Sequence, residues 1–189
     1  MRNTIAVFDI ETGSLPLVDL VANMPPFDPA EVKVGNIKDP QLIEDKIEAA
    51  RVKHRTQYVE NAALDARTGR VITWGIKSDG LNLICPFDNE VEIIEHFWAQ
   101  YGEITSKGYR MVGFNILNFD IPFLIKRSWK HRVRIPATVR SGRYWSDSFI
   151  DLRDIWQCGD RMAGGSLDSI CQHLGVGAKN GNGKDFAAL

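Results

Sequence analysis

The sequence predicts an α/β fold in which helices cover a mixed β-sheet. Short β-branched apolar runs come first, two of them are joined by a hairpin signal, and amphipathic helical segments then alternate with further strands. This alternation favours helices packed on a sheet, and the hairpin supplies the antiparallel part. The length of 189 residues suits one domain with a sizeable core.

The first part of the chain predicts one strand followed by an insertion. Residues 4–10 form a short, nearly continuous apolar run that is typical of a buried strand. The proline-rich segment 16–38 shows no period and is expected to be a long loop. Asp39 is suited to cap a helix over roughly 40–57, because a proline follows it at the first helical position. We expect residues 16–61 to be a loop-helix insertion rather than a second domain.

The remaining elements alternate in type along the chain. We predict strands at 71–76, 81–85, 110–114 and 148–152, and helices at 90–101, 118–130 and 167–174. Ser78-Asp79-Gly80 is a hairpin signal between the first two of these strands. Ser166 is suited to cap the last helix, and Gly175 is suited to end it.

Composition excludes several classes of protein. The formal net charge of −1 does not indicate a polyanionic partner, so any nucleic-acid surface must be local. The three cysteines form no Cys-x-x-Cys pair, which argues against a disulfide framework or a zinc site and indicates a reducing, cytoplasmic location. No apolar stretch reaches membrane-spanning length, so we expect no membrane partner.

Two carboxylates near the end of the first strand are candidate metal ligands. Asp9 and Glu11 are two residues apart, and this spacing puts both side chains on one face of a strand. Neighbouring carboxylates repel each other, and hard divalent cations such as Mg²⁺ bind carboxylate oxygens. The alternative is that this Asp-x-Glu sequence merely faces solvent, because a motif this short is weak evidence by itself.

The residues around this pair resemble the first motif of a known family. Asp9-Ile10-Glu11-Thr12-Gly13-Ser14-Leu15 is similar to the first motif of the DEDD, or DnaQ-like, 3′→5′ exonucleases, which include the proofreading domains of DNA polymerases. The resemblance implies an RNase H-like fold. It also implies that Asp9 bridges two metal ions, that Glu11 holds the ion that activates water, and that Thr12 and Leu15 contact the 3′ end.

A second string resembles the second motif of the same family. Residues 112–124 read Val-Gly-Phe-Asn-Ile-Leu-Asn-Phe-Asp-Ile-Pro-Phe-Leu, in wording closest to the exonucleases related to family B polymerases. The resemblance makes Asp120 the third metal carboxylate and places Asn115 and Phe119 at the substrate. From the residues alone, Asp120 or Asn118 could instead simply cap the helix that follows. The resemblance covers roughly residues 4–15 and 62–186.

A basic stretch follows the second motif without an Asp or Glu to interrupt it. It contains Lys126, Arg127, Lys130, Arg132, Arg134, Arg140 and Arg143, with Trp129, Tyr144 and Trp145 among or beside them. Such a stretch suits phosphate contact and base stacking. We expect Lys126, Arg127 and Lys130 to bind substrate, whereas the alternative is a solvated helix face.

The chain lacks the fourth motif of the family. No Tyr-x-x-x-Asp and no His-x-x-x-x-Asp occurs among its residues. We therefore expect a C-terminally truncated piece that binds metal weakly and cuts slowly or not at all. Asp151 could replace the missing carboxylate, although an aspartate before leucine at a strand end is often structural.

The resemblance implies phosphodiester hydrolysis from the 3′ end of nucleic acid, with DNA favoured over RNA, by two Mg²⁺ or Mn²⁺ ions roughly 4 Å apart. The implied partners are single-stranded or 3′-ended nucleic acid and a polymerase or a replication or repair complex. Two alternatives stay open: a catalytically inactive nucleic-acid-binding or partner-docking domain on the same fold, and an RNase H-like endonuclease.

Overall fold

The computed structural model describes residues 4–139, 148–160 and 162–177. Its internal contacts divide the chain into two compact units. One unit joins the residues up to Thr12 with those from Arg70 onward, and the other spans residues 13–69. The predicted insertion at 16–61 lies within the second unit.

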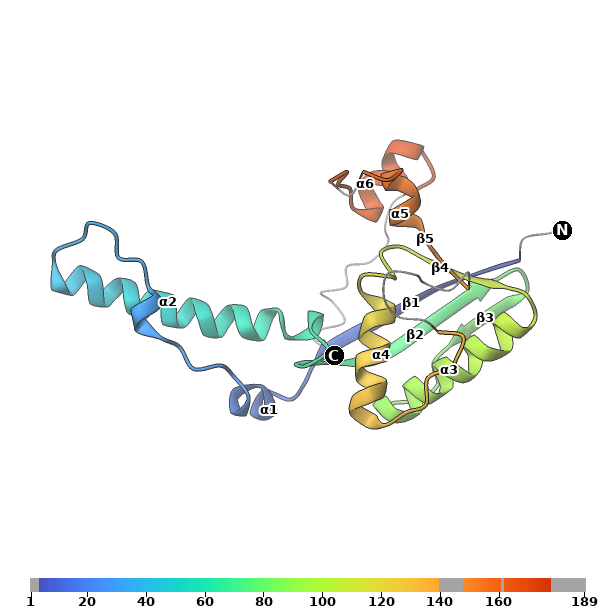
Figure 1. Ribbon diagram of the computed structural model, residues 1–189, viewed down its shortest axis with the longest axis horizontal. Helices are drawn as coiled ribbons and strands as arrows, with labels where there is room; N and C mark the ends of the chain where they lie inside the picture. Colours follow the sequence, from blue (N-terminus) through green and yellow to red (C-terminus); the bar gives the residue numbers. More distant parts are fainter. Residues whose placement is uncertain (1–3, 140–147, 161, 178–189) are drawn as a thin grey trace. The chain divides into compact units, whose positions relative to one another are not determined.

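The first unit contains a five-stranded sheet in the order β3-β2-β1-β4-β5 (Figure 1). The strands are β1 (Ile5–Ser14), β2 (Gly69–Ser78), β3 (Leu81–Ile84), β4 (Arg110–Gly113) and β5 (Phe149–Asp151). β1 pairs with β4 and β4 with β5 in parallel, whereas β2 and β3 are antiparallel. The sheet is therefore mixed, as the sequence predicted.

The helices of this unit follow β3, β4 and β5 along the chain. They are α3 (Glu90–Ser106), α4 (Asp120–His131), α5 (Leu152–Gln157) and α6 (Leu167–Leu174). α3 and α4 pack against each other (Figure 1), and the indole N–H of Trp98 donates to Ser128 Oγ at 2.8 Å between them. Because both polar groups are buried, this bond satisfies atoms that would otherwise be costly to enclose.

Side chains of β1 alternate between the core and the opposite face of the sheet. Ala6, Phe8 and Ile10 are buried, whereas Ile5, Val7 and Asp9 are exposed. The Phe8 ring lies 5.6 Å from that of Phe97, so α3 covers the buried face of the strand. This alternation is the period of two that a half-covered strand requires.

Local sequence signals explain where several elements begin and end. Ser78 pairs with Leu81 across a two-residue turn in which Gly80 has a φ of 79°, a value that favours glycine. Ser166 and Ser169 form a reciprocal cap at the start of α6, and Gly175 ends the helix in the left-handed region. These predictions are confirmed.

Other predicted boundaries differ from the structure. β1 continues to Ser14, well past the predicted end at residue 10, and α3 continues for more than one turn beyond residue 101. The six-residue helix α5 was not predicted. A helix of less than two turns offers too few positions for a helical period to be recognised in the sequence.

The second unit is built around a long helix, α2 (Pro40–Glu60). Asp39 caps it as predicted, since its carboxylate accepts from the Gln41 N–H at 2.9 Å. Half-buried side chains of α2 recur along one face at positions 43, 47, 50, 54 and 58, and position 59 beside them is half-buried as well. The segment before α2 lies against the helix at Phe27, whose ring centroid is 5.8 Å from that of His54. The Arg51 guanidinium lies over the same ring, 5.4 Å from its centroid.

The other helical elements of the second unit are short. They are α1 (Leu17–Ala22), the 3-10 helix η1 (Pro29–Glu31) and the 3-10 helix η2 (Ala62–Leu64). The prediction of a structureless loop over 16–38 was therefore wrong at α1, where Leu20 is buried. No helix in the described part of the chain is long and apolar enough to span a membrane. All three cysteines are free.

Candidate functional site

The carboxylate of Asp120 lies against the backbone of β1. Asp120 is the first residue of α4, and its Oδ1 accepts the N–H of Ile10 at 3.2 Å. Ile10 lies between Asp9 and Glu11, on the C-terminal side of the β1 residues that pair with β4. This hydrogen bond joins β1 to the first residue of α4, which lies 110 residues later in the sequence. It does so beside the carboxylates that the sequence predicted.

The surroundings of Asp120 disfavour its ionised form. The residue is only 3% exposed, and this burial raises the pKa of its carboxyl to about 7. The negative charge of Asp9 adds to the rise, and the charge of Asp151 makes a smaller contribution. The Ile10 N–H favours the carboxylate but does not offset these effects. A cation at this point would relieve both the desolvation and the repulsion.

The structure does not support the alternative that Asn118 or Asp120 merely caps α4. The N-cap position of α4 is occupied by Phe119, and no side chain there accepts a hydrogen bond from the first turn. The Asn118 side chain donates instead to Asn115 Oδ1 at 3.3 Å. Asp120 therefore owes its burial to its contact with β1 rather than to a capping role.

Asp9 and Glu11 both lie within β1, not at its end. Asp9 is exposed and Glu11 is half-buried, on the face opposite the side chain of Ile10. Asp9 is near enough to Asp120 for its negative charge to help raise the pKa of the Asp120 carboxyl. Within residues 4–139, 148–160 and 162–177, however, no three acidic, histidine or cysteine side chains gather closely enough to hold a metal ion. The described structure thus associates Asp120 with Asp9 but assembles no three-ligand site.

Asp151 is a structural anchor rather than an available ligand. It is buried at the end of β5, where Oδ1 accepts the N–H groups of Asn115 and Arg153 at 2.7 and 2.9 Å, and Oδ2 accepts that of Leu117 at 3.0 Å. Three N–H donors occupy both carboxylate oxygens. Asp151 therefore holds the loop that leads from β4 to α4 and so positions Asp120.

The conformation of the loop between β4 and α4 depends on the residue types at two positions, Gly113 and Asn115. Asn115 has a φ of 64°, a left-handed conformation in which asparagine is one of the better-tolerated residues. Its side-chain oxygen accepts from Arg153 Nη1 at 3.0 Å. A Cβ on Gly113 would overlap the Ile116 side chain and lie 3.0 Å from the Phe8 carbonyl oxygen, so glycine permits this close approach. Sequence reasoning assigned Asn115 to the substrate and missed its role in shaping this loop.

The other predicted substrate contacts are dispersed. Thr12 is half-buried in β1, and Phe119 is half-buried with its ring 5.6 Å from that of Phe123. Leu15 belongs to the second unit, where its N–H donates to the Thr68 carbonyl at 2.9 Å. The contacts that these three residues make with a substrate stay predictions.

The basic stretch divides into exposed and buried cations. Lys126 and Lys130 are exposed on α4. Arg127 is 3% exposed and forms a double hydrogen bond with Glu90, with its Nε at 2.8 Å and its Nη2 at 2.6 Å from the carboxylate. The expectation that Arg127 contacts phosphate was therefore wrong, because its guanidinium is enclosed between α3 and α4. Arg140, Arg143, Tyr144 and Trp145 lie outside the described residues.

Glu90 is the centre of this buried cluster. Besides Arg127, its carboxylate accepts the Val71 N–H at 2.8 Å and lies 2.8 Å from His131 Nε2. Burial alone would raise the pKa of Glu90, but the bonds from Arg127, Val71 and His131 outweigh it and hold the pKa below its ordinary value. The cluster ties the starts of β2 and α3 to the end of α4.

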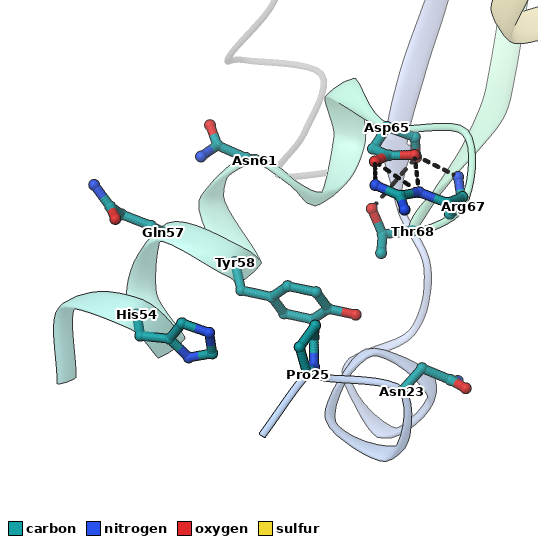
Figure 2. Close-up of a pocket in the computed structure, with 9 residues that line it drawn as sticks. All are labelled: Asn23, Pro25, His54, Gln57, Tyr58, Asn61, Asp65, Arg67 and Thr68. Atoms are coloured by element: carbon teal, nitrogen blue, oxygen red, sulfur yellow. Dashed lines mark hydrogen bonds and ion pairs between the residues drawn. The ribbon is translucent and has the colours of Figure 1, made fainter. Parts of the chain in front are cut away.

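A cavity of about 580 Å³ lies within the second unit. Figure 2 shows the Tyr58 ring reaching from α2 towards Pro25, with the ion pair of Asp65 and Arg67 beside it. The cavity is also lined by Asn23, His54, Gln57, Asn61 and Thr68. None of the residues predicted to bind metal or substrate lines it.

Comparisons with known proteins agree with this architecture. A model of the family described as predicted 3′→5′ exonucleases related to the exonuclease domain of PolB matches residues 62–187. The fold is also similar to that of the family B DNA polymerase from the hyperthermophilic archaeon Pyrobaculum calidifontis, with a TM-score of 0.51 and 18% identity. That match covers 94% of this chain and 19% of the polymerase chain, so this chain spans about a fifth of the polymerase.

No curated protein matches the chain. The likeness to the polymerase concerns the fold alone, and with the sheet order it confirms the predicted RNase H-like α/β class. The family match covers well over half of the chain and includes the second motif but not the first. This chain therefore belongs to the family of predicted 3′→5′ exonucleases related to the exonuclease domain of PolB.

Proposed function

We propose that the protein hydrolyses phosphodiester bonds one nucleotide at a time from the 3′ end of nucleic acid, with DNA preferred over RNA. Asp9, Glu11 and Asp120 would hold divalent ions, Mg²⁺ or Mn²⁺. The observation that carries the proposal is the buried carboxyl of Asp120, which bonds to the backbone between Asp9 and Glu11 and has a pKa of about 7.

The chemistry of these side chains suits a divalent ion. Ionised Asp9 and buried Asp120 repel each other, and a shared cation would convert that repulsion into ligation. Bound divalent ions would supply a hydroxide at neutral pH and neutralise charge on the scissile phosphate. The chain itself contributes the orientation of Asp120, through the Ile10 N–H and the loop that Asp151 holds.

Family membership supports the direction of cleavage and the preference for DNA. The family is related to the exonuclease domain of a DNA polymerase, and such a domain acts on a 3′ end. The partner would then be a single-stranded 3′ terminus, presented by a polymerase or by a replication or repair complex.

Two observations favour a second candidate, a nucleic-acid-binding domain without catalysis. The described residues assemble no group of three metal ligands, and the chain contains neither form of the fourth motif. Titration with Mn²⁺ separates the candidates. The exonuclease binds ions at Asp9 and Asp120, so the Asp9→Asn variant loses that binding, whereas a non-catalytic domain shows no such difference.

The test of the proposed activity is digestion of a 5′-labelled single strand in Mg²⁺ with the protein in excess. Successively shorter labelled products are expected, at a rate about 10²–10⁴ lower than with a general base in place. Asp9→Asn should abolish them, and the matched control Asp88→Asn, at an exposed aspartate, should not. Equal rates for wild type and Asp9→Asn would refute the assignment.

Two further substrates refine the result. An RNA strand of the same sequence should be degraded more slowly than the DNA. A circular single strand should resist, because it has no 3′ end. Cleavage of the circle would identify an endonuclease and overturn the proposal.

A further inference from the structure

We infer that the outer face of α4, formed by Lys126, Trp129 and Lys130, is a stacking platform for an unpaired nucleotide a few positions before the 3′ end. This inference rests on the proposed exonuclease function. It adds a separate contact point, Trp129, and it specifies a substrate whose terminal nucleotides are single-stranded.

Trp129 is unusually exposed for its residue type. Its side chain is 64% exposed, although tryptophan is highly buried on average. Four other tryptophans, Trp74, Trp98, Trp145 and Trp156, occur in the sequence, and Trp74 and Trp98 are core residues. The exposed indole therefore offers a π-face of the kind on which nucleobases stack in single-strand-binding proteins.

Two lysines lie on the same exposed side of the helix as this indole. Lys126 precedes Trp129 by three residues and Lys130 by four, so Lys126 neighbours both of them on the helix surface. Both are exposed, and neither forms an ion pair with any carboxylate in the described part of the chain. Their ammonium groups are free to contact the phosphates on either side of a stacked base.

The surroundings of the platform are positive as well. No Asp or Glu occurs between Asp120 and Asp147, and Arg132 and Arg134 are exposed directly after the helix. In a protein whose net charge is −1, this local excess of cations is complementary to a polyanion rather than to an average protein surface. Charge complementarity thus selects a nucleic-acid strand as the occupant.

The helix fixes the distance from the platform to the candidate site. Asp120 begins α4, and Trp129 follows nine residues later, which is about 13 Å along the axis at a rise of 1.5 Å per residue. Stacked nucleotides rise about 3.4 Å each along one strand. Trp129 would therefore meet a base roughly four nucleotides from the one at Asp120, and fewer if the strand is extended.

This spacing determines which substrates use the platform. A dinucleotide is too short to reach from Asp120 to Trp129, whereas a strand of about ten nucleotides covers both. The bases of a blunt duplex are paired and stacked on their neighbours, so they cannot stack on the indole. The platform therefore favours single-stranded 3′ ends over blunt duplexes.

The experiment measures the affinity of the full chain for labelled DNA in EDTA, where no cleavage occurs. Trp129→Leu, which keeps an apolar side chain but removes the ring, should weaken binding of a ten-nucleotide strand about 5- to 150-fold. Trp129→Tyr should restore most of that affinity. Binding of a dinucleotide or a blunt duplex should differ little between wild type and Trp129→Leu.

The lysines are tested by the dependence of that affinity on salt. Replacing Lys126 and Lys130 with alanine should flatten the slope of log affinity against log salt by about 1.4, since each phosphate contact contributes about 0.7 for single strands. Lys77→Ala, an exposed lysine on β2, is the matched control and should leave the slope unchanged.

Two outcomes would overturn the inference. Equal affinities of wild type and Trp129→Leu for the ten-nucleotide strand would show that no base stacks there, and the face would be available to a protein partner instead. An equal loss for the dinucleotide and the longer strand would place the contact elsewhere. The proposed catalysis is judged separately, by wild-type hydrolysis of a nitrophenyl nucleotide ester in Mg²⁺, because that small substrate does not reach Trp129.

Discussion

Replacing Asp120 with asparagine should stabilise the metal-free protein at neutral and alkaline pH. Asparagine has nearly the same shape, and its side-chain oxygen can still accept the Ile10 N–H. Asparagine carries no charge at any pH. It therefore avoids both the cost of burying a charge and the repulsion from Asp9, which together raise the pKa of Asp120. The variant should fold as the wild type does and lose only this penalty.

The size of the effect follows from the pKa. An increase from the ordinary 3.8 to about 7 penalises the ionised carboxyl by about 4 kcal/mol, since a tenfold change in acidity is 1.36 kcal/mol. Between pH 4 and 7 the folded state retains a proton that the unfolded state has lost. The stability of the wild type therefore falls as pH rises through this window, and the whole penalty is present above pH 7.

Urea unfolding in EDTA at several pH values measures this difference. Wild type and Asp120→Asn should be equally stable near pH 4, and the variant should be more stable by up to about 4 kcal/mol at pH 8. Other ionisable groups are common to both proteins, so the difference isolates Asp120. The exposed-site control Asp88→Asn should show no such trend.

Divalent metal should reverse the order at pH 8. Ions that bind only the folded wild type stabilise it by mass action, whereas the variant lacks a ligand. A stability difference that does not change between pH 5 and 8 in EDTA would refute the electrostatic reasoning. A wild type that Mg²⁺ does not stabilise at any concentration would refute the metal assignment alone.

Two other substitutions test the buried contacts. Arg127→Ala should destabilise the fold by about 3–5 kcal/mol in urea unfolding, because it removes the guanidinium partner of the largely buried Glu90 carboxylate and leaves it only the Val71 N–H and His131. Lys126→Ala on the same helix should change stability by less than about 0.5 kcal/mol, and similar effects of both variants would contradict the buried pair. Asp151→Asn should cost about 1–3 kcal/mol, because an amide nitrogen in place of Oδ2 cannot accept the Leu117 N–H, and it should slow cleavage by displacing the loop. Its control is Asp154→Asn, at an exposed position of α5, and equal stability of the two variants would show that the loop does not depend on Asp151.

Local signals in the sequence were sufficient for much of the fold. A cap, a two-residue turn or a helix-ending glycine acts through hydrogen bonds within a few residues, so Asp39, Gly80 and Gly175 predicted their elements correctly. The order of the longer strands and helices followed from their apolar periods. Helices α1 and α5 were missed because six residues span less than two turns.

The sequence predicted the candidate site because its residues lie in two strings that resemble family motifs. These strings identified Asp9, Glu11 and Asp120, and the fold brings Asp120 to the backbone between the other two. Sequence could not assign the protonation state of Asp120, since this depends on how completely α4 and β1 enclose the carboxyl. Burial is a property of the packed chain and not of any short segment.

The basic stretch shows most clearly what the sequence determined by itself and what only the tertiary structure decided. The sequence determined that the cations lie together, without an intervening acid, directly after Asp120. It could not separate Lys126 and Lys130, which face solvent, from Arg127, whose partner Glu90 lies 37 residues earlier on another helix. Likewise, Asp151 accepts N–H groups from a loop 34 to 36 residues away. Helical period and capping act over a few residues, whereas pairing a buried charge requires two distant elements to pack, and this packing depends on the whole chain.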